Sequence, residues 1–263
     1  MNIIVLVKQV PETESLLELD TENAVVNTDN VKWIVNPYDE YAIEEALKIK
    51  ENLGDSQVSV LSVGPKRSEA ALRTALAMGA DQALLIDDPA AEGSDALGTA
   101  RLLAAALKEM PCDLIIAGMR AVDDDGYQVP AAVAEYLDIP LISTVVKATL
   151  AEGKITCEQT VEGGILEVEG DLPLVITTQK GINEPRYASL PNIMKAKKKP
   201  LGKKALADLE VNADQVGSAA AKTATVSVGH PPEREPGIII EGETATGKAA
   251  ELVRLLKENA KAL

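Results

Sequence analysis

Residues 57–79 read QVSVLSVGPKRSEAALRTALAMG, and this stretch indicates the fold class of the chain. The first seven residues, Gln57 to Val63, have the apolar, β-branched character of a buried strand, and Gly64-Pro65 ends it. Ser68 then begins a helix that stops at Gly79 and carries an apolar stripe of Ala71, Leu72, Ala75 and Leu76. A strand, a short loop and an amphipathic helix in this order form part of a βαβ unit.

The same alternation continues on both sides of this stretch. Upstream, residues 2–7 are an apolar run that precedes Pro11, and Asn36-Pro37-Tyr38-Asp39 supplies a helix cap, a first-turn proline and an acid for a helix closed by Gly54. Downstream, the pattern predicts strands at 83–86 and 113–117 and helices at 94–110 and 130–137. We therefore predict a Rossmann-like α/β fold, similar to adenine-nucleotide-binding universal stress proteins, with a mostly parallel sheet and helices on both faces.

The pattern changes after residue 136. Short strands are expected to extend the sheet, partly antiparallel, at 141–146, 155–158, 164–168 and 172–178. Beyond them, residues 202–233 are rich in Ala, Lys, Asp and Pro, with one short strand expected at 223–228, and residues 247–263 have the stripe of an amphipathic helix. We predict a nucleotide-binding core over 1–200 that includes a loop at 183–199, and a C-terminal arm and helix over 201–263.

The composition of the chain argues against several classes of function. With 26 Lys and Arg against 41 Asp and Glu, the net charge is −15, which disfavours nucleic acid as a partner. The two cysteines, Cys112 and Cys157, are too far apart for a redox or zinc motif and suggest a reducing compartment. The first residues resemble an opening strand more than a signal peptide, so a cytoplasmic protein is expected.

Two sequence features could indicate catalysis or phosphate binding, but the surrounding residues support neither. The only histidine, His230, lies beside two prolines with no orienting partner in view, so triad or histidine-metal chemistry is not expected. Residues 242–249 nearly spell a phosphate-binding P-loop, but Ala249 replaces the Ser or Thr that would hold Mg²⁺. A capped C-terminal helix is the favoured interpretation. No GxGxxG follows the first strand.

The loop from Gly118 to Pro130 is a better candidate for ligand binding. It leaves the carboxyl end of a predicted parallel strand and enters a helix, which is where α/β proteins bind ligands and where free N–H groups meet phosphates. Residues 7–10, 36–39 and 63–64 should reach the same edge of the sheet. Three consecutive acids, Asp123 to Asp125, leave two interpretations: backbone amides and Arg120 face an anion, or the loop is an acidic turn.

A lysine cluster stands out in this acidic chain. Lys195 to Lys204 contain six lysines and no acid, directly after the nearly uncharged stretch Tyr187 to Met194. An apolar tip beside a cationic stem suits a docking arm for an acidic partner, because charges steer encounter while an apolar anchor supplies affinity. A solvated lysine loop is the alternative.

Residues 183–199, NEPRYASLPNIMKAKKK, closely resemble the β subunits of electron transfer flavoproteins. The resemblance covers nearly the whole chain. It includes Lys8-Gln-Val-Pro, Asn36-Pro-Tyr-Asp, the motif at 75–81, the Asp123-Asp-Asp loop with Gln128, and residues 161–178. Several separated motifs in the same order make the match far more specific than any one of them.

The resemblance implies one half of a heterodimer that carries electrons and makes no bonds itself. The α subunit would hold most of a redox-active FAD, and this chain would bury a structural AMP. Electrons would pass from acyl-CoA dehydrogenases to a membrane quinone oxidoreductase, which the protein would contact peripherally.

Residue by residue, the resemblance implies two sites, with Val10 to Thr13 approaching the FAD of the α subunit. The docking loop would have Leu190 as its anchor, supported by Tyr187, Pro191, Ile193, Met194, Lys195 and Lys198. The AMP pocket would use main chain near Leu6 together with Asn36, Pro37, Tyr38, Asp39, Val63, Gly118, Arg120, Ala121, Val122, Asp123, Asp124, Asp125, Gly126, Tyr127, Gln128 and Val129.

Two alternatives stay open. A bifurcating branch of the family keeps a second FAD in the β pocket, with glycines in the loop that are missing here, and the Asp124 side chain should narrow the space for a flavin diphosphate. AMP is therefore favoured. From another class, the chain could be a stand-alone adenine-nucleotide-binding regulatory module, which would leave the arm at 187–199 unexplained.

Overall fold

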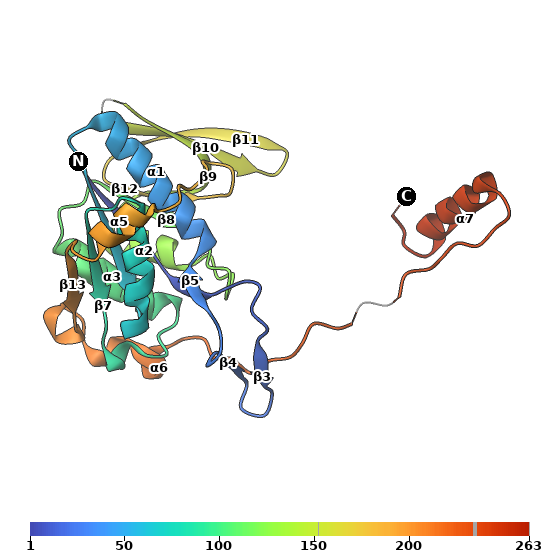
Figure 1. The fold of residues 1–263 in the computed structure, drawn as a ribbon, viewed down its shortest axis with the longest axis horizontal. Helices are drawn as coiled ribbons and strands as arrows, with labels where there is room; N and C mark the ends of the chain where they lie inside the picture. Colours follow the sequence, from blue (N-terminus) through green and yellow to red (C-terminus); the bar gives the residue numbers. More distant parts are fainter. Residues whose placement is uncertain (152, 234–235, 263) are drawn as a thin grey trace. The chain divides into compact units, whose positions relative to one another are not determined.

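The computed structural model describes residues 1–151, 153–233 and 236–262. The chain divides into two compact units, Met1–Ser227 and Val228–Leu263. Within the described residues, one sheet holds nine strands in the order β11-β10-β9-β12-β8-β1-β6-β7-β13 (Figure 1). Their bounds are β1 Asn2–Leu6, β6 Gln57–Val63, β7 Gln82–Ile86, β8 Leu114–Gly118, β9 Leu141–Ala151, β10 Lys154–Val161, β11 Gly164–Asp171, β12 Leu174–Thr178 and β13 Leu201–Lys204.

The sheet is mostly parallel, as predicted. β1 lies between β6 and β8, and all neighbours from β9 through β12 to β13 run parallel. Only the β9–β10 and β10–β11 pairs are antiparallel, which confirms the expected change after residue 136. The carboxyl ends of β1, β6 and β8 therefore meet at one edge of the sheet.

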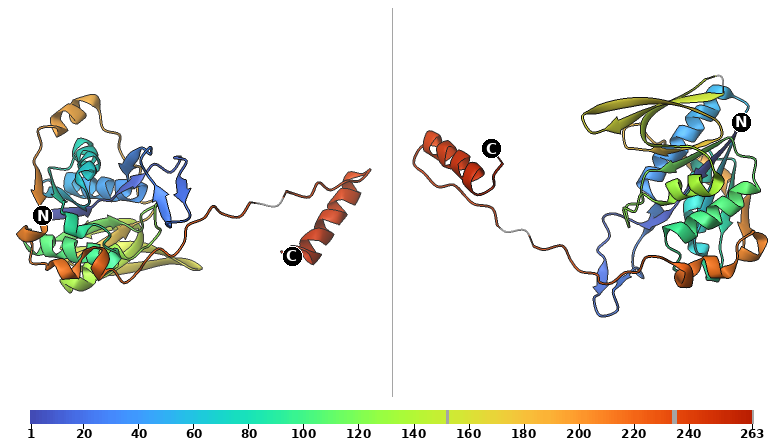
Figure 2. Two further views of the ribbon diagram at one scale, coloured as in Figure 1. Left: turned by 90° about the horizontal axis from the view of Figure 1, so that it is seen from below. Right: turned by 180° about the vertical axis from the view of Figure 1, so that it is seen from behind.

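Helices cover both faces of this sheet (Figure 2). α1 (Pro37–Leu53) and α2 (Glu69–Met78) bury their apolar stripes against one face, and α3 (Ala96–Lys108) and α4 (Val129–Leu137) against the other. Successive residues of β1 point to opposite faces, so Ile3 and Val5 join one core and Ile4 and Leu6 the other. Burying both faces explains why the central strands are continuous apolar runs.

One strand of the main sheet, β13, was not expected from the sequence, and the strand expected at 223–228 does not form. β13, with the sequence LGKK, pairs with β7 from Leu201–Ala83 to Lys204–Ile86, so the sheet and the first unit continue past residue 200. The short, lysine-rich segment has no strand pattern in its own sequence. It becomes a strand because it pairs with β7. Residues 223–228 are described but are not a strand, and Val226 is 91% exposed.

The first unit also contains several short strands, 3-10 turns and short helices. β2 (Gln9–Pro11) pairs with β5 (Trp33–Val35), and β3 (Glu18–Asp20) pairs with β4 (Val25–Asn27) in a hairpin. Figure 1 shows this hairpin reaching away from the main sheet. The remaining elements are 3-10 turns η1 Lys66–Ser68, η2 Pro89–Ala91, η3 Leu206–Asp208 and η4 Ala213–Gln215, and helices α5 Leu190–Ala196 and α6 Gly217–Ala220.

The second unit contains helix α7, Ala245–Glu258. The Thr244 hydroxyl caps it by accepting a hydrogen bond from the Gly247 N–H at 3.1 Å, so the P-loop-like stretch is a helix start, as expected. None of residues 245–258, all of them described, is buried. Among the helices that the structure describes, none is long and apolar enough to cross a bilayer.

Candidate functional site

A cavity of about 410 Å³ opens at the carboxyl edge of the sheet, between the first turns of α3 and α4. Its volume falls within the range of small-molecule sites. The lining residues are Leu6, Val7, Lys8, Asn36, Asp39, Leu61, Val63, Ser94, Asp95, Ala96, Thr99, Leu103, Ala117, Gly118, Met119, Arg120, Ala121, Asp124, Gly126, Tyr127, Gln128, Val129, Pro130 and Thr223.

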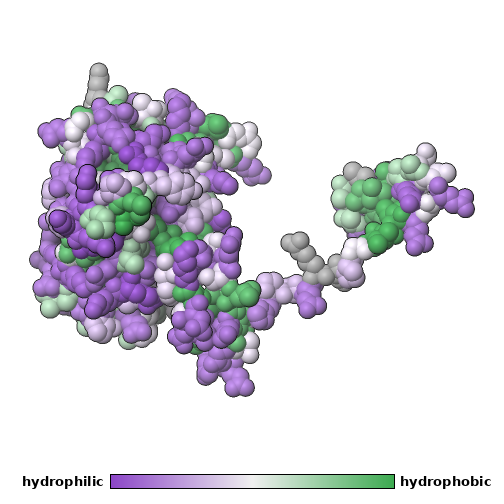
Figure 3. Space-filling view, in the orientation of Figure 1, coloured by the Kyte–Doolittle hydropathy of each residue, from purple (hydrophilic) through white to green (hydrophobic). Residues whose placement is uncertain are grey.

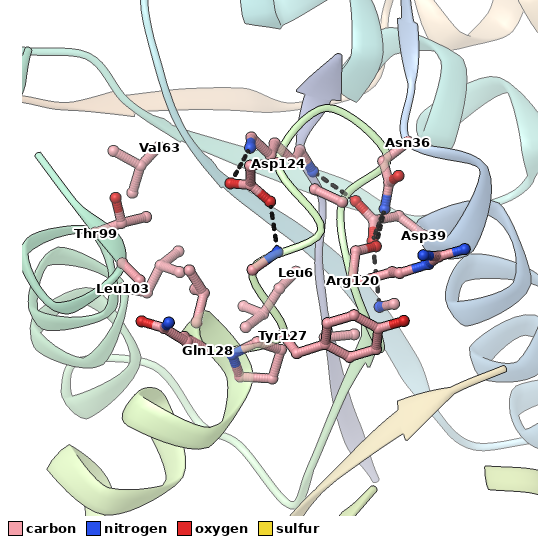
Figure 4. A pocket seen from close by; sticks show the side chains of 18 of the residues that line it. Leu6, Asn36, Asp39, Val63, Thr99, Leu103, Arg120, Asp124, Tyr127 and Gln128 are labelled. Carbon is pink, nitrogen blue, oxygen red and sulfur yellow. Dashed lines mark hydrogen bonds and ion pairs between the residues drawn. The ribbon is translucent and has the colours of Figure 1, made fainter. Parts of the chain in front are cut away.

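The two sides of the cavity differ in chemistry (Figure 4). Val63, Leu103 and Thr99 lie on one side, and two of these three side chains are purely hydrocarbon. Asn36, Asp39 and Arg120 lie on the opposite side, and the Arg120 side chain extends away from Val63, Thr99 and Leu103. A ligand with a flat, weakly polar part and an anionic part could place the first on the apolar side and the second on the polar side.

Asn36 ties the polar side together. Its amide nitrogen donates to Asp39 Oδ1 and to the Arg120 carbonyl, each at 2.9 Å, and its amide oxygen accepts from the Val122 N–H at 3.2 Å. The sequence suggested that Asn36 caps α1, but its side chain makes no capping hydrogen bond. The reason is that the loop after β8 comes close enough to compete for both ends of the amide.

Asp39 is the buried acceptor beneath this loop, with 5% of its surface exposed. Oδ2 accepts from the Lys8 N–H at 2.7 Å, and Oδ1 accepts from the Gly118 N–H at 3.2 Å as well as from Asn36. Burial raises the pKa of Asp39 to about 7, while these three donors act in the opposite direction. One carboxyl thus joins the end of β1, the end of β8 and the start of α1.

Two cations pair with the three consecutive aspartates. Lys8 Nζ lies 2.8 Å from Asp123 Oδ1 and 3.0 Å from Asp124 Oδ2, and Arg120 Nη1 lies 2.9 Å from Asp125 Oδ1. Pairing offsets most of the negative charge at the rim of the cavity, which removes the main electrostatic objection to an anion there.

Arg120 is further held by aromatic rings. Its Nη2 donates to the Tyr38 hydroxyl at 2.8 Å, and its guanidinium carbon lies 4.9 Å from the Tyr38 ring centroid and 5.7 Å from that of Tyr127. Tyr127 has a positive φ of 57°, which brings the chain around toward α4. The guanidinium is therefore fixed in place before any ligand enters.

The first turn of α4 faces the cavity with backbone N–H groups available. Within the described part of the chain, no side chain caps this helix, because Gln128 at the cap position makes no side-chain hydrogen bond. The start of α3 differs, since Asp95 Oδ1 accepts from the Leu97 and Gly98 N–H groups at 3.1 and 3.0 Å. The open start of α4 is the place in the cavity best suited to an anion.

A segment from the C-terminal part of the first unit completes the wall. The Lys222 N–H donates to Asp95 Oδ2 at 2.6 Å, and the Gly217 N–H donates to the Ser94 hydroxyl at 2.8 Å. Thr223 lines the cavity as a result. Backbone hydrogen bonds to Asp95, first from the Gly98 N–H and then from the Lys222 N–H, lower the pKa of Asp95 below its usual value.

The structure brings most of the expected pocket residues to one place. Leu6, Asn36, Asp39, Val63, Gly118, Arg120, Ala121, Asp124 and Gly126 to Val129 all line the cavity, whereas Pro37, Tyr38, Val122, Asp123 and Asp125 do not. Of the latter, Tyr38, Asp123 and Asp125 act on the lining cations instead.

Sequence reasoning missed part of the cavity wall at Ser94, Asp95, Thr99, Leu103 and Thr223. Ser94, Asp95 and Thr99 lie between β7 and the early part of α3, so the rule that ligands sit beyond strand carboxyl ends would have found them, whereas Leu103 lies further along α3. Thr223 had no such signal, because its position depends on hydrogen bonds to Asp95. Val10, expected near the FAD of the α subunit, is fully buried in β2, and this role stays a prediction.

The expected docking arm has an exposed apolar tip. Tyr187 is 99% exposed, Leu190 79%, Met194 62% and Ile193 42%. Leu190 and Pro191 begin α5, and the Ser189 hydroxyl caps this short helix by accepting from the Asn192 N–H. So many exposed large apolar side chains in a short segment mark an interaction surface.

The base of the arm is fixed to α1 and α2. On one side, Arg186 donates to both carboxylate oxygens of Glu44, at 2.8 and 2.9 Å, and also to Glu51. On the other side, Arg73 of α2 donates to the carbonyls of Ala196 and Lys199 at 2.7 and 2.9 Å.

Lys199 makes the reverse connection. Its ammonium donates to the carbonyls of Leu76 and Ala80 at the end of α2, at 3.0 and 2.5 Å. Each helix end thus receives a cation from the other segment, a favourable arrangement at a helix C-terminus. Further along the lysine cluster, Lys203 pairs with Glu69 and Lys204 with Glu109. Several lysines therefore hold the stem.

The sheet order, the helices on both faces and the cavity at the carboxyl edge define a Rossmann-like α/β protein. Residues 23–209 match the family model described as the electron transfer flavoprotein domain. The chain belongs to the electron transfer flavoprotein family, and its relatives there are β subunits.

Three of these relatives, all named electron transfer flavoprotein subunit beta, span nearly the full length. The Bacillus subtilis protein is 41% identical over 264 residues, covering 100% of both chains. The Methylophilus methylotrophus protein is 38% identical, covering 98% of each, and the Bos taurus protein is 36% identical, covering 97% of this chain and 99% of its own. The designation β implies an α subunit as partner in a heterodimer.

Proposed function

We propose that this chain pairs with an α subunit that holds most of a redox-active FAD, and that it binds a structural AMP in the cavity at the sheet edge. The heterodimer then accepts electrons from an acyl-CoA dehydrogenase and passes them to a quinone oxidoreductase at the membrane. The chain itself makes and breaks no substrate bonds; it contributes the pocket, a face toward the flavin and the docking arm.

The observation that carries the nucleotide assignment is the two-sided cavity. Leu6, Val63 and Leu103 offer hydrocarbon to an adenine ring, while the open start of α4 offers N–H groups to one phosphate. Asp124 is held at the rim by Lys8. A second phosphate and a flavin would have to displace this pair, which favours a monophosphate.

Nucleotide analysis of the purified heterodimer tests this assignment. Denaturation should release one FAD and one AMP for each heterodimer, as measured by chromatography and mass spectrometry. Two FAD per heterodimer would instead support the bifurcating alternative. Release of no adenylate would contradict both, and a stable homodimer that binds nucleotide without an α subunit would favour the stand-alone regulatory module.

The proposal for the docking arm rests on its exposed tip and its fixed base. Binding costs less entropy when the backbone of the docking element is already ordered. The connections from Arg73, Arg186 and Lys199 hold the two ends of the arm, so a partner needs to order little besides side chains. Leu190 is proposed as the anchor that enters an apolar pocket of the dehydrogenase.

Leu190→Ala should weaken electron transfer from the dehydrogenase by about tenfold or more, since truncating a buried anchor commonly costs about 2 kcal/mol. Stopped-flow reduction of the heterodimer by the reduced dehydrogenase measures this change as a higher half-saturation concentration. Leu53→Ala is the matched control, because Leu53 is 45% exposed at the end of α1, outside the arm.

Nucleotide content should be unchanged in both variants. Equal transfer kinetics for wild type and Leu190→Ala would refute the anchor role. Loss of flavin in the Leu190 variant would show that the arm is needed for assembly rather than docking.

The exposed apolar residues of α7 support a permanent partner for the second unit. Leu252 is 46% exposed and Val253 49%, and both lie on the stripe expected from the sequence. We propose that this helix packs on the α subunit.

A further inference from the structure

The β3–β4 hairpin has no core of its own. None of residues 12–30, all of them described, is buried, and the two strands are three residues each. An isolated two-stranded hairpin of this size is at best marginally stable in water. For the β3–β4 hairpin to keep this conformation, contacts beyond those described for the segment must stabilise it.

The hairpin and the two residues before it expose four large apolar side chains. Leu16 is 96% exposed, Val25 52%, Leu17 40% and Val26 37%. Figure 3 shows hydrophobic residues gathered in this region of the first unit, with hydrophilic ones around them. Aliphatic residues concentrated on a segment without a core indicate a surface that is covered in the working protein.

The charge of the hairpin narrows the choice of partner. Residues 12–30 contain six acids, Glu12, Glu14, Glu18, Asp20, Glu22 and Asp29, and no lysine or arginine. A complementary surface carries an apolar strip with basic residues at its rim. The same hairpin on a second copy would place acid against acid, so a symmetric hairpin-to-hairpin dimer is disfavoured.

The hairpin is also connected, at both of its ends, to segments that contain residues lining the cavity. It emerges from the β2–β5 pair, and β2 follows Lys8 while β5 precedes Asn36. An aliphatic surface on a segment that cannot stand alone suits a permanent partner better than a transient one, because obligate interfaces are the more apolar. The heterodimer offers one permanent partner, the α subunit.

From these observations we infer that the β3–β4 hairpin is a docking element for the α subunit, which receives Leu16 and Val25 on an apolar strip rimmed by lysine and arginine. This inference rests on the heterodimer of the proposed function. It adds, to the contact proposed for α7, a contact region next to the segments that lead into the cavity.

Two paired substitutions test the inference in the heterodimer. Leu16→Ser with Val25→Ser should weaken association of the subunits at least tenfold, as measured by the dissociation constant in sedimentation or mass photometry. Leu53→Ser is the control for an exposed aliphatic residue elsewhere. Thermal unfolding of the isolated chain reports folding separately, and it should change little because the hairpin buries no residue.

A second pair of substitutions, Glu18→Lys with Glu22→Lys, tests the role of the acidic charges. Glu135→Lys, on the exposed face of α4, is its control. The hairpin variant should associate more weakly than wild type, and the deficit should shrink as salt screens the charges. Hydrogen exchange of residues 16–27 should slow when the α subunit binds.

The inference would be overturned if both paired variants bound the α subunit as tightly as wild type does. It would also be overturned if the wild-type chain formed a homodimer that these variants abolish. If the wild-type subunits do not associate at all, the heterodimer itself fails, which is a different result.

Discussion

Gly118→Ala is expected to lower the free energy of unfolding by about 3 kcal/mol and to abolish the proposed nucleotide binding in the cavity at the sheet edge. Gly118 ends β8 directly beneath the start of α1. A methyl group there would lie 2.4 Å from Asp39 Oδ1, 2.7 Å from Tyr38 Cβ and 2.8 Å from the Tyr38 carbonyl carbon. Such distances are far inside van der Waals contact, and one of the atoms belongs to the backbone, so either β8 or α1 has to move.

The movement would also disturb the hydrogen bonds of the site. The Gly118 N–H donates to Asp39, and the loop that follows supplies Arg120. Chemical denaturation of the isolated chain measures the stability change, and nucleotide content of the purified heterodimer measures the loss of binding.

Gly126→Ala provides a matched control in the same loop. There the nearest atom to an added methyl group is Asp124 Oδ1 at 3.4 Å, an ordinary contact distance. This variant should unfold within about 1 kcal/mol of wild type. Equal stability for the two alanine variants would contradict the close approach of β8 and α1.

Asp39→Ala is expected to destabilise the chain by roughly 4 kcal/mol, because it leaves buried N–H donors without an acceptor. The Lys8 N–H, the Gly118 N–H and the Asn36 amide all point at this carboxyl. Unpaired, each costs more than the net gain of a typical hydrogen bond. Urea unfolding measures the change, and Asp55→Ala at an exposed position is the control.

Asp39→Asn separates charge from shape. The amide keeps the size of the side chain but turns one acceptor into a donor, which would face either Lys8 or the Asn36 and Gly118 pair. A smaller loss of about 2 kcal/mol is expected. A stability equal to that of wild type would show that these donors find other acceptors.

The Asp39 variants also predict a pH dependence. The folded-state pKa of about 7 lies above the usual 3.8, so the folded chain binds the extra proton more tightly than the unfolded chain does. The contribution of this group to stability is therefore full below about pH 4 and declines as pH rises toward 7. The slope of stability against pH in this window should be shallower for Asp39→Asn than for wild type.

Most of the fold could be predicted because local sequence and tertiary structure agree. The strand at 57–63, the helix at 69–78 and the glycine that ends it are specified within a few residues, by hydrophobic period and by helix-stop signals. The antiparallel strands after residue 136 also carry their own turn signals. Where each segment favours the conformation it adopts, sequence reasoning succeeds.

The failures share one physical cause, which is that distant groups decide the outcome. Asn36 looks like a helix cap, but the loop after β8 engages its amide. β13 has no strand pattern and exists because β7 offers an unpaired edge. Thr223 reaches the cavity because Asp95 binds the backbone beside it. None of these contacts can be read from neighbouring residues.

The exchange of cations between α2 and the base of the arm separates recognition from folding. Arg73 and Lys199 satisfy carbonyls at helix ends, and they do so without any side chain between Tyr187 and Met194. The tip at residues 187–194 is thus structurally independent of the hydrogen bonds that fix the base of the arm. For the docking role proposed above, exchanging residues 187–194 alone should change the choice of partner while leaving the sheet, the cavity and the base of the arm as they are.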